Sequence, residues 1–164
     1  MVPSLDLQLQ AALKALSDTV APAIDPADKM AVEQLHLVIA SLGMVRERMP
    51  VQRRFIRRLL EDALALAEEL NSIESDDGLA QAITGARAAL SDPELETHEL
   101  EETRAMLTSV TVKLINTAGG EGLDRFGAVV ARGSKMPLDR LRAWSILSGF
   151  EPDASAVKSL NSLI

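Results

Sequence analysis

Apolar side chains recur at steps of three and four residues along most of the chain, which is the spacing of one face of an α-helix. In the first segment these positions are Leu5, Leu9, Leu13, Leu16 and Val20. They predict a helix over 5–20. Pro22 is expected to end it, because a proline pushes the residue before it out of helical geometry.

The next segment, 27–49, is apolar around most of its helical circumference. Its apolar residues are Val32, Leu35, Leu37, Val38, Ile39, Leu42, Met44 and Val45. Asp25 and Pro26 are expected to start this helix, as a capping side chain followed by a first-turn proline. A helix with so narrow a polar stripe is typical of the centre of a bundle or of a contact between subunits.

Three further helices are predicted from two-faced patterns and start signals. The segment 51–70 carries apolar residues on one side and arginines and glutamates on the other. The polar run at 75–77 is a start signal for a helix over 79–90. Asp92 and Pro93 are expected to open a helix that ends near 117. Its predicted core stripe is Leu95, Met106, Leu107, Val110 and Leu114.

The last third of the chain has a weaker pattern. The segment 118–136 contains several glycines and is expected to be an irregular hinge. Pro137 and Pro152 are expected to open two short helices. We therefore predict an all-α fold: an antiparallel bundle of four to five helices over 5–117, followed by a short helical C-terminal extension over 137–164. Together they are expected to form a single compact domain.

Composition agrees with a helical chain and excludes several kinds of site. The 164 residues are 47% hydrophobic, mostly leucine and alanine, which are good helix formers. The absence of cysteine excludes disulfides, thiolate nucleophiles and zinc–thiolate centres. A net charge of −7, with three Phe and one Trp as the only aromatic residues, argues against binding of nucleic acid.

The sequence also lacks targeting signals. Its first residues have neither the basic start nor the apolar centre of a signal peptide. No apolar run approaches the roughly 20 residues that a bilayer-spanning helix needs. We therefore expect a cytoplasmic protein that does not bind a membrane.

Glu33 and His36 form the pair that comes nearest to a metal motif. A Glu and a His three residues apart share one helix face, and two such motifs build the di-iron sites of four-helix bundles. The only other histidine is His98, and Leu95 stands where its glutamate should be. We therefore expect no metal. The pair is a candidate polar lining for a pocket between helices, or His36 is a boundary histidine beside apolar neighbours.

A cluster of arginines spans the second and third predicted helices. Its members are Arg46, Arg48, Arg53, Arg54, Arg57 and Arg58. Guanidinium groups bind carboxylates and phosphates through two hydrogen bonds, so the cluster is a candidate anion site. Two acidic blocks at 61–77 and 92–102 contain no Lys or Arg and offer salt-bridge partners instead, within the fold or across a subunit contact. The acidic surface of a partner protein is a third destination.

Four apolar residues are candidates for an interface. They are Leu42, Leu141, Trp144 and Phe150. Leu42 lies on the apolar second helix, and the other three lie in the extension. Aromatic side chains often anchor interfaces. The extension is expected to dock either on its own bundle or on a neighbouring chain.

No catalytic set and no cofactor are predicted. The glycines after 118 follow no predicted strand and lack the Gly-Lys-Ser/Thr end of a phosphate loop. The Gly-x-Ser-x-Gly turn that exposes a serine nucleophile is also missing.

The order of these elements resembles a family of small all-helical bacterial proteins of unknown function. The resemblance covers roughly 5–117 and rests on a leucine-rich helix, the segment VAPAI at 20–24, an apolar helix, and LSDPEL at 90–95 opening a helix that ends in Lys113 and Leu114. Genes of that family lie beside phosphotransferase-like kinases and acyl-CoA dehydrogenases. The resemblance implies an association with small-molecule or acyl-thioester metabolism, and it assigns no catalytic residues.

The predicted function is that of a non-catalytic helical interaction protein. We expect it to self-associate, as a dimer, or to be an accessory to another protein. The alternative is a bundle or enzyme that binds an anionic or acyl small molecule between its helices.

Overall fold

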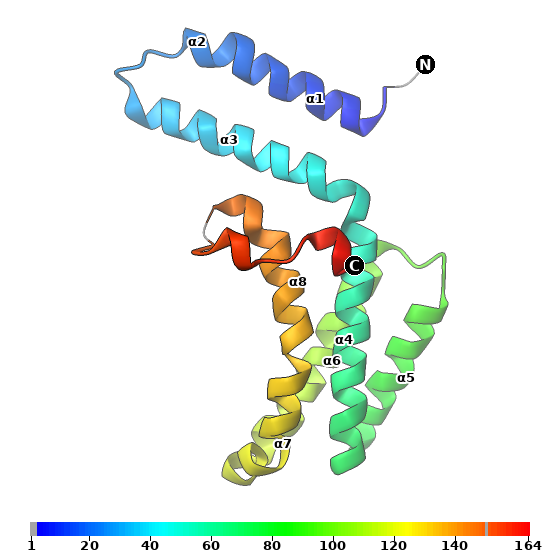
Figure 1. Cartoon of the computed structure of the whole chain (residues 1–164). Helices are drawn as coiled ribbons and strands as arrows, with labels where there is room; N and C mark the ends of the chain where they lie inside the picture. Colours follow the sequence, from blue (N-terminus) through cyan, green and yellow to red (C-terminus); the bar gives the residue numbers. More distant parts are fainter. Residues whose placement is uncertain (1–2, 150) are drawn as a thin grey trace. The chain divides into compact units, whose positions relative to one another are not determined.

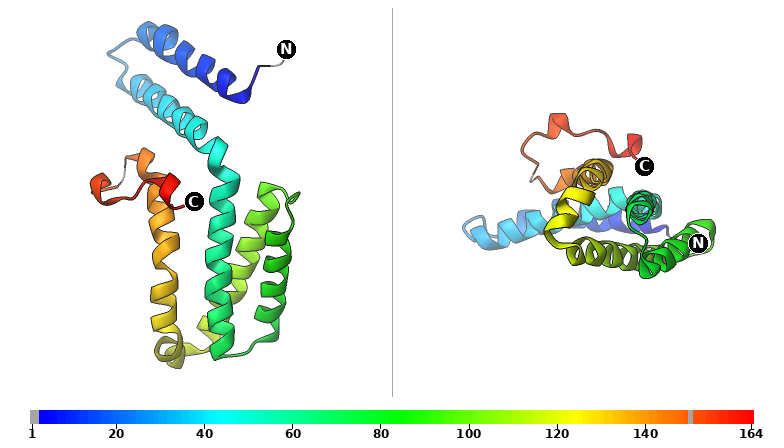
Figure 2. Two further views of the ribbon diagram at one scale, coloured as in Figure 1. Left: turned by 45° about the vertical axis from the view of Figure 1, so that its right-hand side comes forward. Right: turned by 90° about the horizontal axis from the view of Figure 1, so that it is seen from below.

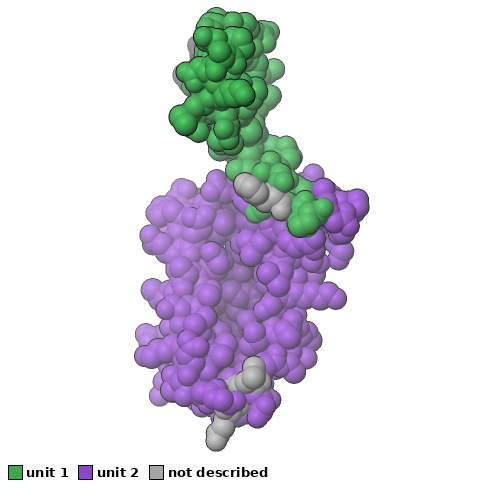
Figure 3. Space-filling model, turned by 90° about the vertical axis from the view of Figure 1, so that its left-hand side faces the viewer, with its two compact units in different colours: residues 1–51, 145–152 green, residues 52–144, 153–164 purple. Residues whose placement is uncertain are grey.

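The structure, a computed structural model, describes residues 3–149 and 151–164, apart from the side chains of 121–123. Its regular elements are helices, and these residues contain no β-strand (Figure 1). The predicted all-α class is confirmed. The chain divides into two compact units (Figure 3): unit 1 comprises 1–51 and 145–152, and unit 2 comprises 52–144 and 153–164.

This division differs from the single bundle over 5–117 that we expected. The first two predicted helices lie in unit 1, and the C-terminal region contributes to both units. The change of unit falls at the 3₁₀ turn Met49–Val51. Pro50 in this turn has no N–H to donate, so the regular helical hydrogen bonding is interrupted there.

Unit 1 is built on a helical hairpin. The hairpin consists of α1 (Leu5–Ala15), a π-helical turn (Leu16–Val20), α2 (Ala21–Ala23) and α3 (Lys29–Arg48). Unit 1 also contains the 3₁₀ turn Ile146–Ser148, which contacts α3. α1 and α3 lie side by side (Figures 1 and 2).

Pro22 does not end the first helix where we expected. The chain stays helical through the π-helical turn and into α2, which ends at Ala23. The N–H of Ala21 donates to the carbonyl of Leu16, five residues back instead of four. This wider turn suits Pro22, which has no N–H that would need a partner.

Asp25 and Pro26 precede α3 but do not open it. Asp25 accepts a hydrogen bond from the N–H of Ala27 at 2.9 Å within a turn. The cap of α3 is Asp28, which accepts from the N–H of Ala31 at 3.0 Å. Two acidic residues were available in this connection, and the turn placed the second one at the helix start.

Unit 2 contains the longer packed helices: α4 (Gln52–Ile73), α5 (Asp77–Ser91), α6 (Thr97–Thr117), α7 (Gly119–Gly133) and α8 (Lys135–Ser145). α4, α5 and α6 contact one another, and α7 contacts α4 and α6. Figure 2 shows α7 and α8 following one another along α4.

The core of unit 2 is centred on α4. The buried apolar residues of this helix are Phe55, Ile56, Leu59, Leu60, Ala67 and Leu70. They fall on the apolar side that the sequence pattern predicted. Asp76 caps α5 by accepting from the N–H of Leu79 at 2.7 Å, and it lies within the predicted start signal.

α6 begins later than we expected. Its start is a capping box, in which Glu96 is the cap and the Glu99 side chain accepts from the Glu96 N–H at 2.8 Å. Because this reciprocal pair satisfies more backbone donors than Asp92 and Pro93 can, it sets the helix start. One predicted core residue is misplaced, since Met106 is 66% exposed. Leu107 and Leu114 are buried as predicted.

The glycine-containing segment that we expected to be irregular forms α7 instead. Phe126 is fully buried and Val129 nearly so, and their burial outweighs the low helix propensity of the glycines. Gly133 also has a packing role. A Cβ built at this position would stand 2.9 Å from Cδ1 of Leu66 on α4, so the missing side chain permits a close approach of the two helices.

Of the two short C-terminal helices that we expected, the first is present as α8 and the second is not formed. Pro137 lies in the first turns of α8, which starts at Lys135. The second predicted helix, from Pro152, is replaced by 3₁₀ turns at Ala154–Ala156 and Leu160–Ser162. These turns still anchor the chain end, because Leu160 and Leu163 are buried.

Candidate functional site

Glu33 and His36 both lie exposed on α3. They line a shallow, open groove of about 420 Å³ together with Pro26, Lys29, Val32, Leu37 and Ala40. Neither side chain is enclosed between helices. No group of three or more His, Asp or Glu side chains within 3–149 and 151–164 is arranged to hold a metal ion.

Two arginines of the cluster belong to unit 1. Nε of Arg46 donates to Oδ1 of Asp6 at 2.6 Å, which ties the end of α3 to the start of α1. This hydrogen bond lowers the pKa of Asp6 and raises the pKa of Arg46. Arg48 is buried, and its guanidinium lies 3.3 Å from a carboxylate oxygen of Glu47.

Arg53 and Arg57 hold the connection between α5 and α6. Arg53 donates to the main-chain carbonyls of Leu95 and, at 2.7 Å, of Pro93. Arg57 donates to the carbonyl of Leu90 at 2.6 Å. Leu90 is in the last turn of α5, where carbonyls lack a partner within the helix. These two guanidinium groups therefore bind the backbone of their own chain.

The remaining pair of the cluster differs in its surroundings. Arg58 pairs with Glu61 at 2.6 Å, one turn along α4. Arg54 is exposed, and its side chain makes neither a hydrogen bond nor an ion pair with the described residues. Most arginines of the cluster therefore have partners within their own unit. The structure does not bring the six arginines together around a common anion site.

The acidic block at 61–77, which begins on α4 and runs past its end, is bound by arginines that the sequence analysis did not consider. Arg87 of α5 pairs with Glu68 at 2.8 Å, and Arg125 of α7 pairs with Glu74 at 2.7 Å. Arg132 and Arg140 pair with two further members of the block.

The candidate interface residues of the extension lie in different environments. Trp144 stacks on Phe55 of α4, so this aromatic ring contacts its own unit. Leu141 is 45% exposed on α8. Leu42 is half-buried on α3. Phe150 lies outside the described residues.

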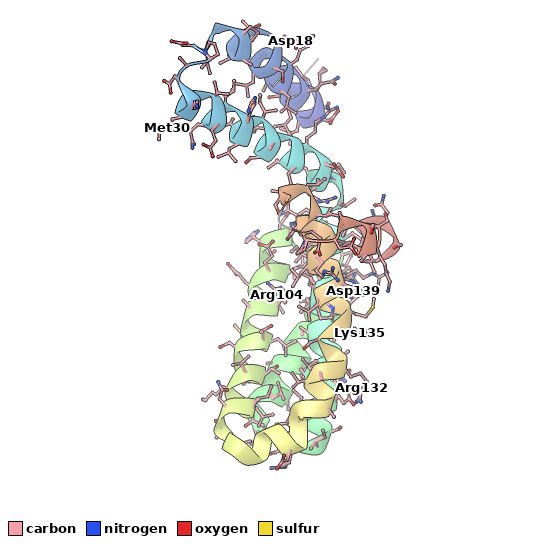
Figure 4. The ribbon with its side chains drawn as sticks, turned by 60° about the vertical axis from the view of Figure 1, so that its left-hand side comes forward. Asp18, Met30, Arg104, Arg132, Lys135 and Asp139 are labelled. Carbon is pink, nitrogen blue, oxygen red and sulfur yellow. The ribbon has the colours of Figure 1, made fainter. Side chains whose placement is uncertain are left out.

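One side of α3 in unit 1 carries several exposed apolar side chains. Its apolar members are exposed by 75% at Met30, 53% at Leu37, 46% at Val38 and 48% at Val45. The side chains of Gln34 and Ser41 lie exposed between them. We call these six residues the outer face. They occupy about 100° of the helix circumference and lie away from the side on which Arg46 contacts α1. Figure 4 shows Met30 pointing away from α1.

A groove between α5 and α6 is the second feature that the sequence analysis missed. It has a volume of about 830 Å³. Small residues of α5 form one wall: Gly78, Ala82, Gly85 and Ala89. Asp92, Glu99 and Glu102 line it as well, together with the exposed Met106. The signal in the sequence was the stripe of small residues at steps of three and four in α5.

No protein-family model, curated protein or solved structure matches the chain. The family resemblance noted in the sequence stays a prediction. Within the described part of the chain, no helix combines the length and the apolar character that a membrane span requires.

Proposed function

We propose that the protein is a non-catalytic helical interaction protein, and that the α1–α3 hairpin joins it to another polypeptide chain. The observation that carries this proposal is the outer face of α3, where four large apolar side chains are exposed. Clusters of exposed apolar residues on a folded chain are typical of protein–protein contacts.

The distribution of buried residues supports this function. Among the residues whose burial the structure describes, Leu35 is the one buried hydrophobic residue of unit 1, and the others lie in unit 2. α1 has no buried residue. Each large apolar side chain removed from water contributes about 1.5–3 kcal/mol. A hairpin with so small a core therefore gains more stability from association than a bundle with a complete hydrophobic core does. Pairing with another hairpin would complete an antiparallel bundle of four helices.

The test compares two matched valine variants of the full chain. Val45→Glu places a charge on the outer face, and Val112→Glu places one on α6 of unit 2, where Val112 is 46% exposed. Native mass spectrometry of each variant gives the mass of the assembly, and circular dichroism confirms that both fold. We expect wild type and Val112→Glu to carry a second polypeptide chain, and Val45→Glu to lose it at least tenfold more readily. Equal assembly masses for all three proteins would contradict the proposal.

A second candidate function, binding of a small molecule, is favoured by the groove between α5 and α6. Its volume of about 830 Å³ is within the usual range for ligand pockets. The carboxylates that line it favour a cationic amphiphile over the anionic or acyl ligand suggested by the arginines. A thermal-shift measurement with alkylammonium compounds and with acyl-CoA distinguishes them. The control is Gly85→Leu, which fills the groove and should abolish a genuine shift, since no atom lies within 4 Å of a Cβ at this position. A ligand that shifts wild type and Gly85→Leu alike does not bind here.

A further inference from the structure

The order of polar and apolar residues along the outer face of α3 is the same in both directions along the helix. Its midpoint lies between Leu37 and Val38, and the other four members fall into two equidistant pairs. Met30 and Val45 are equidistant from this midpoint, and both are apolar. Gln34 and Ser41 are also equidistant from it, and both are polar, with an amide and a hydroxyl group. All six side chains are exposed.

We infer that a second copy of this chain covers the outer face, with the two α3 helices antiparallel and their two-fold axis between Leu37 and Val38. This inference rests on the proposed function and names its partner. In this register each Met30 lies level with the partner's Val45, and each Gln34 lies level with the partner's Ser41. A polar pair inside an apolar seam fixes the register of paired helices, because any shift leaves the polar groups against apolar ones.

The charges along α3 favour the antiparallel direction. Its N-terminal end carries the acidic Asp25, Asp28 and Glu33 and the basic Lys29. Its last turn carries the basic Arg46 and Arg48 with the acidic Glu47 between them. An antiparallel pair keeps the two acidic starts of α3 apart and opposes the two helix dipoles. A parallel pair would place the acidic ends together, with the two copies of Glu33 at the same level.

The two basic side chains at the end of α3 have other surroundings than the seam. Arg46 is held by Asp6 of α1, and Arg48 is buried. The six residues of the outer face carry no charge, so the seam requires no desolvation of an ionised group. The seam from Met30 to Val45 is roughly 22 Å long, which is about four helical turns.

Because the chain contains no cysteine, site-specific cross-linking gives a direct test. The full chain is made as Met30→Cys, as Val45→Cys and as the double variant, and each is treated with a short bismaleimide. Denaturing electrophoresis then measures the covalent dimer. We expect the double variant to become mostly covalent dimer and each single variant to remain at least tenfold less cross-linked. The two thiols of one chain are roughly 22 Å apart, so the short reagent cannot join them within a chain.

The control variant is Met30→Cys combined with Val112→Cys, which measures chance collisions. Cross-linking of both single variants as readily as the double variant would show a parallel pair and overturn the inference. A dimeric wild-type mass without cross-linking of the double variant would overturn the inference. A wild-type mass that contains a different polypeptide chain, lost in Val45→Glu, would also overturn the inference but leave the proposed function intact. A wild-type chain that is monomeric and carries no partner would contradict both.

Discussion

The rings of Phe55 and Trp144 stack with their centroids 4.0 Å apart and their planes inclined by 15°. Phe55 is at the start of α4 and is 3% exposed, and Trp144 is near the end of α8. The contact therefore ties the first turns of the central helix of unit 2 to a helix that follows about ninety residues later in the sequence. Trp144 is the single tryptophan, so its fluorescence reports on this contact.

We predict that Trp144→Ala lowers the free energy of unfolding by about 3 kcal/mol, because it removes a large ring from a packed contact. Trp144→Phe keeps an aromatic ring on Phe55 and should lose less than about 1.5 kcal/mol. Urea denaturation followed by circular dichroism measures both. Equal losses for the two variants would show that the stacked ring is not what stabilises α8.

A second prediction concerns the ion pair between Arg140 of α8 and Asp62 of α4. The two side chains are only 11% and 17% exposed, and Nε of Arg140 also donates to the carbonyl of Leu163 at 2.7 Å. Asp62→Leu leaves a largely buried guanidinium without its counter-charge. We expect this variant to lose about 3 kcal/mol of stability.

The double variant Asp62→Leu with Arg140→Met removes both charges together. We expect it to lose clearly less than the sum of the two single variants, because neither charge is left uncompensated. A double-mutant cycle from urea denaturation gives the coupling. Additive losses would mean that the two charges do not stabilise one another.

The third prediction compares two neighbouring arginines of the cluster. Arg53 donates to the carbonyls of Pro93 and Leu95, whereas Arg54 makes no such bond among the described residues. Arg53→Met should lower stability by about 1.5–3 kcal/mol, because hydrogen bonds from a charged donor are lost. It should also speed amide hydrogen exchange at the start of α6. Arg54→Met should change stability by less than about 0.5 kcal/mol. The opposite ranking would refute this assignment of roles.

The fourth prediction is a pH dependence of the α1–α3 hairpin. The hydrogen bond from Arg46 holds the pKa of Asp6 below its ordinary value of 3.8. The folded hairpin therefore binds a proton less readily than the unfolded chain does. The stabilisation is present above pH 3.8 and is lost as the pH falls through the lowered pKa.

Hydrogen exchange of the α1 amides at several pH values measures this dependence. Asp6→Asn should weaken protection at neutral pH and match wild type once Asp6 is protonated. Because Asp6 is 55% exposed in this pair, added salt should reduce the difference. A difference between wild type and Asp6→Asn that persists unchanged below the lowered pKa would contradict the mechanism.

The features that the sequence alone determined are local ones. The apolar side of α4 was predictable from Phe55 to Leu70, because three- and four-residue steps place these side chains on one face whatever they meet. Asp76 was predictable as a cap for the same reason, since its hydrogen bond reaches only three residues along the chain. The apolar circumference of α3 was visible as well, and it marked the helix whose outer face is left exposed.

Tertiary structure decided everything that depends on partners distant in sequence. The glycines of α7 favour an irregular segment, and only the burial of Phe126 against the rest of unit 2 overrides that preference. Long arginine side chains can reach many acceptors, so Arg53 could not be assigned to backbone carbonyls before the connection after α5 was placed beside it. The pairing of Asp62 with Arg140 required α8 to lie along α4. Local hydrogen bonds and periodicity are encoded within a few residues, whereas these contacts exist only when separate helices have packed.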